Sequence, residues 1–283
     1  MKKIAMVILA AIMMQPVIEA KKDKEVRTYD LKVMSYNIRN GKAKDGTNSW
    51  ELRYATTAMM IEDQMPDIFG VQEAYDYQVK FIADNFKTYG NVGVGREDGK
   101  SKNEHMSIFW NKKTISLLKS GTFWLSETPE KPSKGWDSKH YRTATWALMK
   151  DKRTGKKFYF VNTHLDHRGV LAQKNGLALI VSRIDEINPK GYPMVLTGDF
   201  NVKPDNAALA DLDKIMQSSR KVAKKTDNLN TFNGWGKAKP DQVIDYIYVS
   251  GFSDCLEYQT VTKPYADRKF ISDHFPIFTT LKF

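Results

Sequence analysis

The sequence has little cysteine and none of the short signatures that mark several common enzyme classes. Cys255 is the single cysteine in 283 residues, so the chain can form no internal disulfide and needs a sizeable core for its stability. The absence of a cysteine pair and of HExxH argues against a zinc site, and neither GxSxG nor GxxxxGK[ST] occurs. These absences exclude the usual serine-hydrolase and P-loop chemistries.

Linker-like sequence is also missing. From Tyr29 onward there is no glycine- and serine-rich segment, no proline run, no repeat and no low-complexity tract. A chain of this length can bury one substantial core or form two modest domains. Because nothing in the sequence marks a boundary, we predict one domain over residues 21–283, and we expect it to be a monomer.

The apolar N-terminal stretch is too short for a comfortable transmembrane helix. Two lysines precede the stretch from Ile4 to Ile18, and Ala20 provides a small residue for cleavage. We predict that residues 1–20 are an export signal that is removed, which leaves a periplasmic or extracellular protein without a transmembrane segment. An uncleaved anchor is the alternative. No cysteine lies near the cleavage point, which argues against a lipoprotein.

Acidic residues are outnumbered by basic ones, and the formal net charge is +11. A basic surface attracts polyanions such as nucleic acid, phosphorylated metabolites or anionic lipid. A solvated lysine-rich face is the other interpretation of the same charge. The lysine-rich segment 218–228 is open to both interpretations, as a nucleic-acid patch or as a solvated loop or helix.

Short apolar runs typical of strands recur along the chain and outnumber helical patterns. The runs are LKVMSYNI (31–38), DIFGVQ (67–72), HMSIFW (105–110), TATWALM (143–149), KFYFVNTHL (157–165), PMVLTGDF (193–200), VIDYIYVS (243–250) and PIFTTLKF (276–283). Because strands and helices are spread through the whole chain, we expect layered sheets covered by helices, in the α/β or α+β class.

Two segments have the spacing of amphipathic helices. Asn48 is expected to cap a helix over residues 49–65, with Glu51 three residues further on. A second helix is predicted over residues 170–187. The expected apolar faces are Leu52, Ala55 and Met59 in the first helix and Leu177, Ile180, Val181, Ile184 and Ile187 in the second.

Six of the strand-like segments carry polar side chains near one end. These side chains are Asn37 and Arg39, Glu73, His164 and Asp166, Asp199 and Asn201, Asp245, and Asp273 and His274. Taken singly, an asparagine or aspartate at a strand end can start a turn, and a lone histidine can be structural. Asp245 resists that interpretation, because a carboxylate within a buried strand is costly unless it is paired. Asp199 and Asn201 are expected to lie side by side, since residues two apart in a strand share a face.

Together these groups indicate a metal site. If the strand ends converge, the site holds several carboxylates, two amides and two histidines. Hard oxygen ligands of this kind suit Mg²⁺, with Mn²⁺ as a substitute, better than Zn²⁺.

The order of the motifs resembles the endonuclease/exonuclease/phosphatase superfamily, the metal-dependent phosphoesterases related to DNase I, exonuclease III and the Ccr4-like deadenylases. The likeness runs from about Leu31 to the C-terminus and rests on SYNIR, VQEA, NTHLDH, TGDFN, IDYIYV and SDHFP, in the family's order. The stretches GVGREDGK, GTFWLSETP and YRTATWA resemble a bacterial branch, here expected to be exported. The resemblance implies a DNase I-like four-layer sandwich, two packed mixed β-sheets flanked by helices, with the site at one edge.

The resemblance also implies roles for the residues around the metal. Glu73 resembles the principal metal-binding glutamate, and Asn37 resembles the amide that steadies the metal and the phosphate of the substrate. Asp273 would be a further metal contact. Asp199 would orient or deprotonate the attacking water. Asn201 would hold a phosphate oxygen.

The histidines follow from the same resemblance. Asp245 would hydrogen-bond to His274 and set its tautomer. His164 would protonate the leaving oxygen, and Glu104 is expected to pair with it. Whether Asp199 or His274 is the general base stays open at this point.

Three further residues are expected around the substrate. Arg39 and Arg142 would contact phosphate through their guanidinium forks, although an arginine taken alone is more often an ordinary surface residue. Asp166, from the NTHLDH segment, would support the site from behind.

The sequence restricts the identity of the substrate less than it restricts the type of reaction. Ala74 stands where abasic-site endonucleases commonly have threonine, and the disulfide cysteines of DNase I are absent. The leading hypothesis is a phosphoesterase acting on nucleic acid or a nucleotide-like substrate, which the positive charge favours. A phosphatase or phosphodiesterase for sugar, inositol or lipid phosphates is the second hypothesis. A binding protein without activity is disfavoured by the complete set of polar strand ends.

Overall fold

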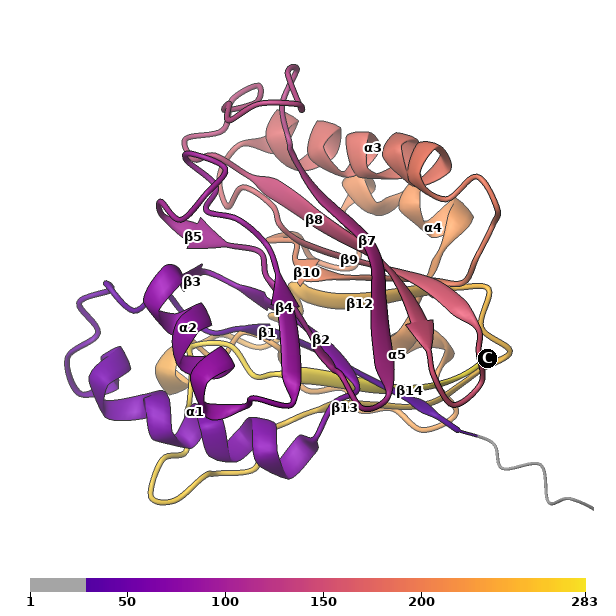
Figure 1. Cartoon of the computed structure of the whole chain (residues 1–283). Coiled ribbons are helices and arrows are strands. Elements are labelled where there is room, and N and C mark those ends of the chain that lie inside the picture. Colours follow the sequence, from indigo (N-terminus) through magenta and orange to yellow (C-terminus); the bar gives the residue numbers. More distant parts are fainter. Residues whose placement is uncertain (1–28) are drawn as a thin grey trace, which may run out of the picture.

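The strands of the chain form two sheets stacked face to face, as the computed structural model of residues 29–283 describes them (Figure 1). The predicted export signal, residues 1–20, lies outside the described residues. The first sheet consists, in spatial order, of β13 (Asp254–Thr260), β14 (Ile277–Lys282), β1 (Leu31–Asn37), β2 (Ile68–Gln72), β6 (Ile108–Asn111) and β4 (Tyr89–Val92). The second consists of β11 (Gln217–Ser218), β12 (Asp245–Ser250), β10 (Met194–Asp199), β9 (Lys157–His164), β8 (Thr143–Asp151) and β7 (Ile115–Trp124). A small separate ribbon pairs β3 (Ala74–Tyr75) with β5 (Glu104–His105).

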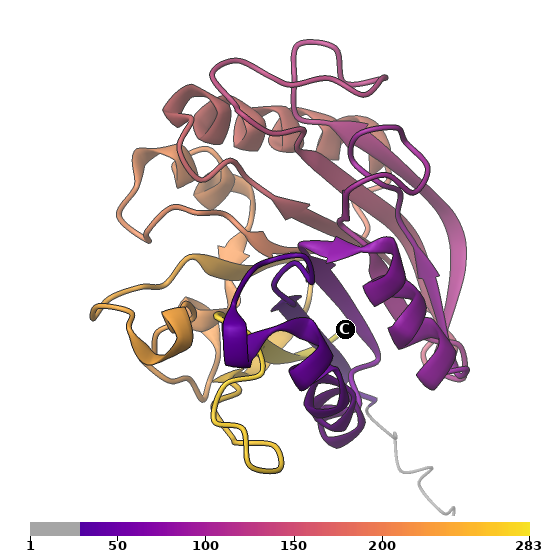
Figure 2. The same cartoon turned by 90° about the vertical axis from the view of Figure 1, so that its left-hand side faces the viewer.

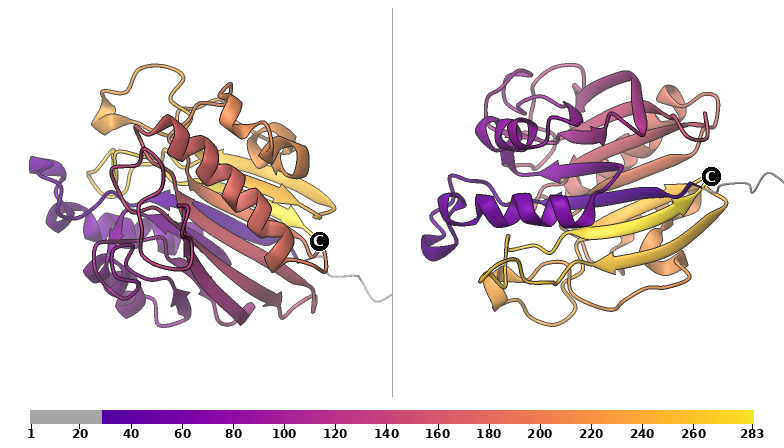
Figure 3. Two further views of the ribbon diagram at one scale, coloured as in Figure 1. Left: turned by 90° about the horizontal axis from the view of Figure 1, so that it is seen from above. Right: turned by 60° about the horizontal axis from the view of Figure 1, so that its bottom comes forward.

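Helices cover the outer faces of both sheets (Figures 1 and 3). The first sheet is covered by α1 (Trp50–Gln64) and α2 (Asp76–Asn85). The second is covered by α3 (Val170–Ile187) and α4 (Leu212–Ile215), while α5 (Ser219–Val222) packs against β12 and β13. The prediction for α3 is confirmed, since it has the expected bounds and buries Leu177, Ile180 and Ile184. No helix in the described part of the chain is long and apolar enough to cross a membrane.

Successive side chains of the central strands point to opposite faces of their sheet, which divides the core into layers. In β1, Leu31 and Val33 point between the two sheets and pack against residues of the second sheet such as Phe160. Met34 and Tyr36 point the other way and pack under α1 and α2. Because successive side chains of a strand face opposite sides, a central strand buried on both faces reads as a continuous apolar run. The expected four-layer sandwich of the α/β type is confirmed.

All eight apolar runs contain strands. In the two large sheets, the strands that the apolar pattern did not predict lie at the edges. β4 and β13 are the two edges of the first sheet, and β7 and β11 are the edges of the second. An edge strand buries less of its surface, as in β7, whose central residues are exposed or half-buried. Its sequence, ISLLKSGTFW, therefore carries a weaker apolar signal than the central strands do.

The predicted helix over residues 49–65 exists, but its cap and its apolar face were wrong. α1 begins after Ser49, not Asn48, and no side chain caps it. Leu52, Ala55 and Met59 are exposed. The buried face comprises Trp50, Arg53, Thr56, Thr57, Met60 and Ile61. The pattern misled because an arginine faces inward: the Arg53 guanidinium donates hydrogen bonds to the carbonyls of Asn48, Ile38, Ile271 and Arg39.

A buried polar network joins the two sheets just behind the edge at which β2, β9 and β10 end. The Oδ1 atom of Asn162, a residue of β9, accepts hydrogen bonds from Gln72 Nε2 at 2.7 Å and from the Thr197 hydroxyl at 3.0 Å. Its Nδ2 donates to the carbonyls of Val71 and Ser107. Every polar atom of this buried amide is thus satisfied, which makes the network favourable in a low-dielectric interior.

We expect Asn162→Ala to lower the free energy of unfolding by about 2–4 kcal/mol, because several buried partners lose their hydrogen bonds at once. Urea denaturation followed by circular dichroism measures the change. Asn91→Ala, at an exposed position of β4, is the matched control and should stay within about 0.5 kcal/mol of the unaltered protein. Equal stability of the two variants would show that the network contributes little.

Candidate active site

Four parallel strands end at one edge of the sandwich and deliver polar side chains there. In the first sheet, β1 and β2 run parallel with Asn37 opposite Gln72, and Glu73 follows immediately. In the second sheet, β9 and β10 run parallel with His164 opposite Asp199. Figure 2 views the molecule from the side toward which β1 runs, so this edge faces the reader.

Two antiparallel strands begin at the same edge. β12 starts with Asp245, which stands opposite Asp199, so that His164, Asp199 and Asp245 form one row across three neighbouring strands. In the first sheet, Asp273 and His274 come just before β14, which pairs with β1. The order of parallel and antiparallel strands therefore brings residues as distant in the chain as Asn37 and His274 to the same edge.

Asn37 connects the polar groups of the two sheets. Its Nδ2 donates to Glu73 Oε1 at 3.1 Å and to Asp199 Oδ2 at 2.9 Å, and its Oδ1 accepts from the Arg39 backbone N–H at 3.0 Å. The other Glu73 oxygen accepts from the backbone and the side chain of Asn40. Asn37 thus holds two carboxylates at a set distance from each other.

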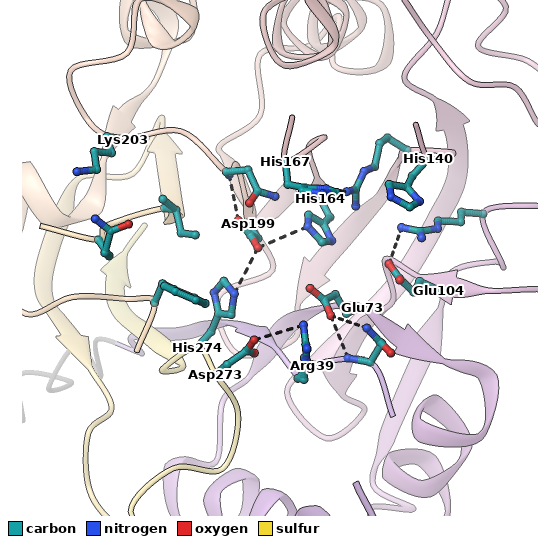
Figure 4. Close-up of a pocket in the computed structure, with 17 residues that line it drawn as sticks. Arg39, Glu73, Glu104, His140, His164, His167, Asp199, Lys203, Asp273 and His274 are labelled. Atoms are coloured by element: carbon teal, nitrogen blue, oxygen red, sulfur yellow. Dashed lines mark hydrogen bonds and ion pairs between the residues drawn. The ribbon is translucent and has the colours of Figure 1, made fainter. Parts of the chain in front are cut away.

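Asp199 lies at the centre of the cluster (Figure 4). Its side chain is 2% exposed, and its Oδ2 lies 3.5 Å from His164 Nε2 and 3.7 Å from His274 Nε2. On the far side of its ring, His274 Nδ1 is 2.8 Å from Asp245 Oδ2. His274 is therefore held between two buried carboxylates, with its Nε2 directed toward Asp199.

The charges of the cluster shift its proton affinities. Burial and the nearby Asp245 raise the pKa of Asp199, against the opposing effect of His274. Burial alone would lower the pKa of His274, but Asp245 and Asp199 raise it well above the usual histidine value. Burial alone would raise the pKa of Glu73, but His274, the Asn40 N–H and Arg39 hold it below its usual value. At neutral pH His274 is therefore protonated and Glu73 is ionised.

His164 lies in a different electrostatic environment. Burial, together with the positive charges of Arg142 and Arg96, holds the pKa of His164 well below the usual histidine value. The expected pairing of His164 with Glu104 was wrong, because Glu104 Oε2 lies 2.5 Å from Arg96 Nη1 and forms a buried ion pair with it. A buried carboxylate pairs preferentially with a guanidinium, whose charge does not depend on pH in this range.

Arg39 lies at the pocket, but its fork is already engaged. Its Nε and Nη2 donate to the two oxygens of Asp45 at 2.9 and 3.0 Å, and its Nη1 lies 3.4 Å from Asp273 Oδ2. The guanidinium of Arg39 therefore holds Asp273 in place and has no free pair of N–H groups for a phosphate. Asp166 is held from behind by the Ser138 hydroxyl and by the backbone N–H groups of residues 168 and 169.

Three residues of the site have a left-handed backbone: Arg39 with φ 59°, Glu73 with φ 62° and Asn201 with φ 53°. Non-glycine residues adopt this conformation at a cost and concentrate at functional sites when they do. The expectation that Asp199 and Asn201 share a strand face was wrong, because β10 ends at Asp199 and the chain turns. Asn201 is held by a bond from its N–H to Asp199 Oδ1 and one from its Nδ2 to the Leu165 carbonyl.

Most of these side chains line a cavity of about 740 Å³ at the edge of the sandwich; Asn37, Asp166 and Asp245 are not among its lining residues. Several lining residues were not predicted as site residues: Asn40, Arg96, His140, His167, Lys203, Phe232, Gln242 and Ile244. Arg96 and His167 lie within motif stretches recognised in the sequence, GVGREDGK and NTHLDH, and could have been found there. Phe232, Gln242 and Ile244 come from the connection before β12, where no sequence pattern marks them.

The donor set fits a divalent cation. Glu73, His164 and Asp199 offer ligand atoms that lie within 4.8 Å of one another, and Asp199, Asp245 and His274 form a second such group. Carboxylates this close together repel each other unless a cation or a proton lies between them. The oxygen-rich set, with Asp273 beside Glu73, matches the preference of Mg²⁺ or Mn²⁺.

The chain belongs to the endonuclease/exonuclease/phosphatase family, whose model matches residues 34–274. Members of this family are phosphoesterases and generally depend on a divalent metal ion. The sequence-based recognition of the family is confirmed.

Solved structures of relatives agree with this assignment. An endonuclease/exonuclease/phosphatase family protein from Bacteroides thetaiotaomicron is 34% identical, with a TM-score of 0.86, over 91% of this chain and 99% of that one. A mannosyl-6-phosphatase, Bt3783 of Bacteroides thetaiotaomicron VPI-5482, is 36% identical, with a TM-score of 0.85, over 89% of this chain and 100% of that one. The human Nocturnin catalytic domain, 18% identical with a TM-score of 0.70 over 89% and 93% of the two chains, shares the fold.

Proposed function

We propose that this protein is an exported, Mg²⁺-dependent phosphoesterase, periplasmic or extracellular and monomeric, that hydrolyses a phosphate ester in the 740 Å³ cavity. The observation that carries the proposal is the Asp199 carboxylate, which is buried between His164 and His274 and tied through Asn37 to Glu73. Such a cluster is costly to bury without a function, because its like charges repel in a low-dielectric environment.

Asp199 is the residue best suited to be the general base. Its raised pKa brings its proton affinity closer to that of a base acting near neutral pH. His274 holds a proton between Asp245 and Asp199, so it cannot accept one from water and instead stabilises negative charge on the phosphate. These proton affinities support Asp199, and not His274, as the proposed general base.

The remaining residues hold the ester. Asn201 contacts a phosphate oxygen, and the neutral His164 donates a hydrogen bond to the leaving oxygen. Glu73, with Asp273 and the amide of Asn37, would hold the cation, which when bound would polarise the phosphoryl group and lower the charge barrier to attack. This assignment keeps His164 at the leaving oxygen, but as a hydrogen-bond donor, because its depressed pKa leaves it without a second proton.

For the substrate, a small phosphate ester is better supported than nucleic acid. The mannosyl-6-phosphatase of Bacteroides thetaiotaomicron is 36% identical and covered over its full length, and a pocket of this size accommodates a sugar-sized ligand. The net charge of +11 keeps a nucleic-acid or nucleotide-like substrate as the second candidate, since charge alone favours polyanions.

Removal of divalent metal ions is expected to abolish hydrolysis. Dialysis against EDTA should stop phosphate release, and excess Mg²⁺ or Mn²⁺ should restore it, because the clustered carboxylates cannot bind an anionic ester without a cation. Phosphate release is measured with a colorimetric assay before and after each addition. Turnover that continues undiminished in EDTA would rule out the proposed mechanism.

A substrate screen separates the two candidates. Hexose 6-phosphates, inositol phosphates, and single- and double-stranded DNA and RNA are compared at equal concentration in Mg²⁺. We expect phosphate release from a hexose phosphate and no shortening of the nucleic acids. Cleavage of DNA or RNA without release of phosphate from small esters would establish the nucleic-acid candidate instead.

A further inference from the structure

Arg142 is a buried arginine whose hydrogen-bonding capacity is mostly unused. It is 5% exposed, yet its Nε and Nη1 atoms have no hydrogen-bond partner among residues 29–283. The nearest carboxylate oxygen, Asp166 Oδ2, is 3.6 Å from Nε, beyond a hydrogen bond, and it already accepts from Ser138. Nη2 has one long contact, 3.4 Å to His167 Nδ1. Buried donors without partners are rare, because each costs the full loss of its hydration.

A second buried arginine shows what a purely structural role looks like in this protein. Arg53 is 1% exposed, and each of its three guanidinium nitrogens donates to a backbone carbonyl at 2.6–3.2 Å. Arg153 is likewise engaged, by the carboxylates of Asp151 and Asp67. Arg142 alone among these three lines the cavity, and it alone of the three has buried guanidinium nitrogens without a hydrogen-bond partner in the described part of the chain.

Polar groups surround Arg142 on one side of the cavity. Arg96, paired with Glu104, comes from the connection between β4 and β5, His140 from the connection between β7 and β8, and His167 from the loop after β9. The rings of His140 and His167 are 5.5 Å apart. In Figure 4, His140 and Glu104 lie on one side of Glu73 and His164, and His274, Asp273 and Lys203 lie on the other. The cavity therefore has two halves, with Glu73 and His164 between them.

We propose that Arg142, together with Arg96, His140 and His167, forms a second anion-binding subsite, and that the substrate carries a second oxyanion beside the phosphate that is hydrolysed. A phosphate, sulfate or carboxylate there would accept hydrogen bonds from the Arg142 guanidinium, whose planar fork suits an oxyanion. The link to a substrate rests on the proposed phosphoesterase function, whereas the binding of an anion does not. The subsite would select small esters with two anionic groups over monoanionic esters of the same size.

The first experiment measures anion binding without any catalysis. Inorganic sulfate is titrated into the protein in EDTA by calorimetry, for the unaltered chain and for Arg142→Gln. We expect Arg142→Gln to weaken sulfate binding by about tenfold or more, the value of one or two charge-assisted hydrogen bonds. Arg168→Gln is the matched control, since it removes the same charge at an exposed position beside His167, and it should change the affinity by less than about twofold. Equal weakening by both variants, or no weakening by Arg142→Gln, would overturn the subsite.

Thermal unfolding shows whether Arg142→Gln still folds. A second variant tests the subsite independently in case it does not. The double variant Arg96→Gln/Glu104→Gln removes a buried ion pair together, so it leaves no buried charge unpaired and the net charge unchanged. We expect sulfate binding to weaken about threefold or more, since one guanidinium of the subsite is lost. Unchanged binding in this folded variant would remove Arg96 from the subsite and contradict the proposal as stated.

The third measurement connects the subsite to the substrate. We expect kcat/KM to be higher for a hexose bisphosphate than for the hexose 6-phosphate, and the ratio of the two to fall about tenfold or more in Arg142→Gln. An equal loss for both esters would mean that Arg142 contacts the hydrolysed phosphate, which overturns the second subsite. If no ester is hydrolysed by the unaltered protein, the phosphoesterase function fails and the sulfate titrations alone decide the subsite.

Discussion

Glu73→Gln is expected to lower metal-dependent phosphoester hydrolysis by about a thousandfold. The substitution keeps the size of the side chain but removes the negative charge that would bind the cation, which contributes several kcal/mol to stabilising the transition state. The single amide oxygen of the glutamine can still accept from one of the two partners of Glu73, Asn37 or Asn40, and the side chain keeps its size, so the fold should be kept. Phosphate release and the affinity for Mn²⁺, by calorimetry, are both measured, and both should fall.

Glu51→Gln is the matched control for this prediction. Glu51 lies exposed in the first turn of α1, away from the cavity, and its replacement should leave both quantities within about twofold. Full activity of Glu73→Gln with undiminished Mn²⁺ binding would show that another group holds the cation, and the remaining candidates would then be Asp273 and Asp199.

Asp199→Asn is expected to have an effect of similar size, a loss of about 10²–10⁴-fold in kcat, through a different cause. An amide cannot accept the proton of the attacking water, and the substitution also removes one of the two carboxylates that keep His274 protonated. Metal affinity should fall much less than in Glu73→Gln. Steady-state kinetics and the Mn²⁺ titration together distinguish a lost base from a lost ligand.

Asp205→Asn serves as the control for Asp199→Asn, because Asp205 follows in the same loop and is exposed. It should leave kcat within about twofold. If Asp199→Asn kept more than about a tenth of the activity, Asp199 would not be the general base, because positioned acid–base groups contribute at least about a hundredfold.

Much of the fold could be predicted from the sequence, because the central strands of both sheets are buried on both faces. Such strands read as continuous apolar runs, and the helix over residues 170–187 has a regular apolar stripe. The same reasoning did not predict the edge strands, which bury less apolar surface: β4, β7, β11 and β13. In α1 the apolar pattern pointed to the wrong face, since Arg53 faces inward and is satisfied by carbonyls distant in sequence.

The site residues could be identified at the ends of strands, but the contacts between them could not. Glu104 was assigned to His164, yet it pairs with Arg96, which reaches it through the turn between β4 and β5. Arg39 was expected to contact phosphate, yet Asp45 holds its fork. Each of these partners is chosen by the distance and burial of competing groups in the folded chain, which residue order does not encode directly.

By itself, the sequence determined the family, the oxygen-rich chemistry of the site and the strands that carry it, because motif order and apolar runs are local properties of the chain. Tertiary structure decided the rest. The register of β9, β10 and β12 places His164, Asp199 and Asp245 in one row, and Asn37 reaches Asp199 across 162 residues of sequence. The tertiary structure also decided that the guanidinium of Arg53 finds hydrogen-bond partners, whereas two nitrogens of Arg142 do not. Only packing determines which buried donors find a partner.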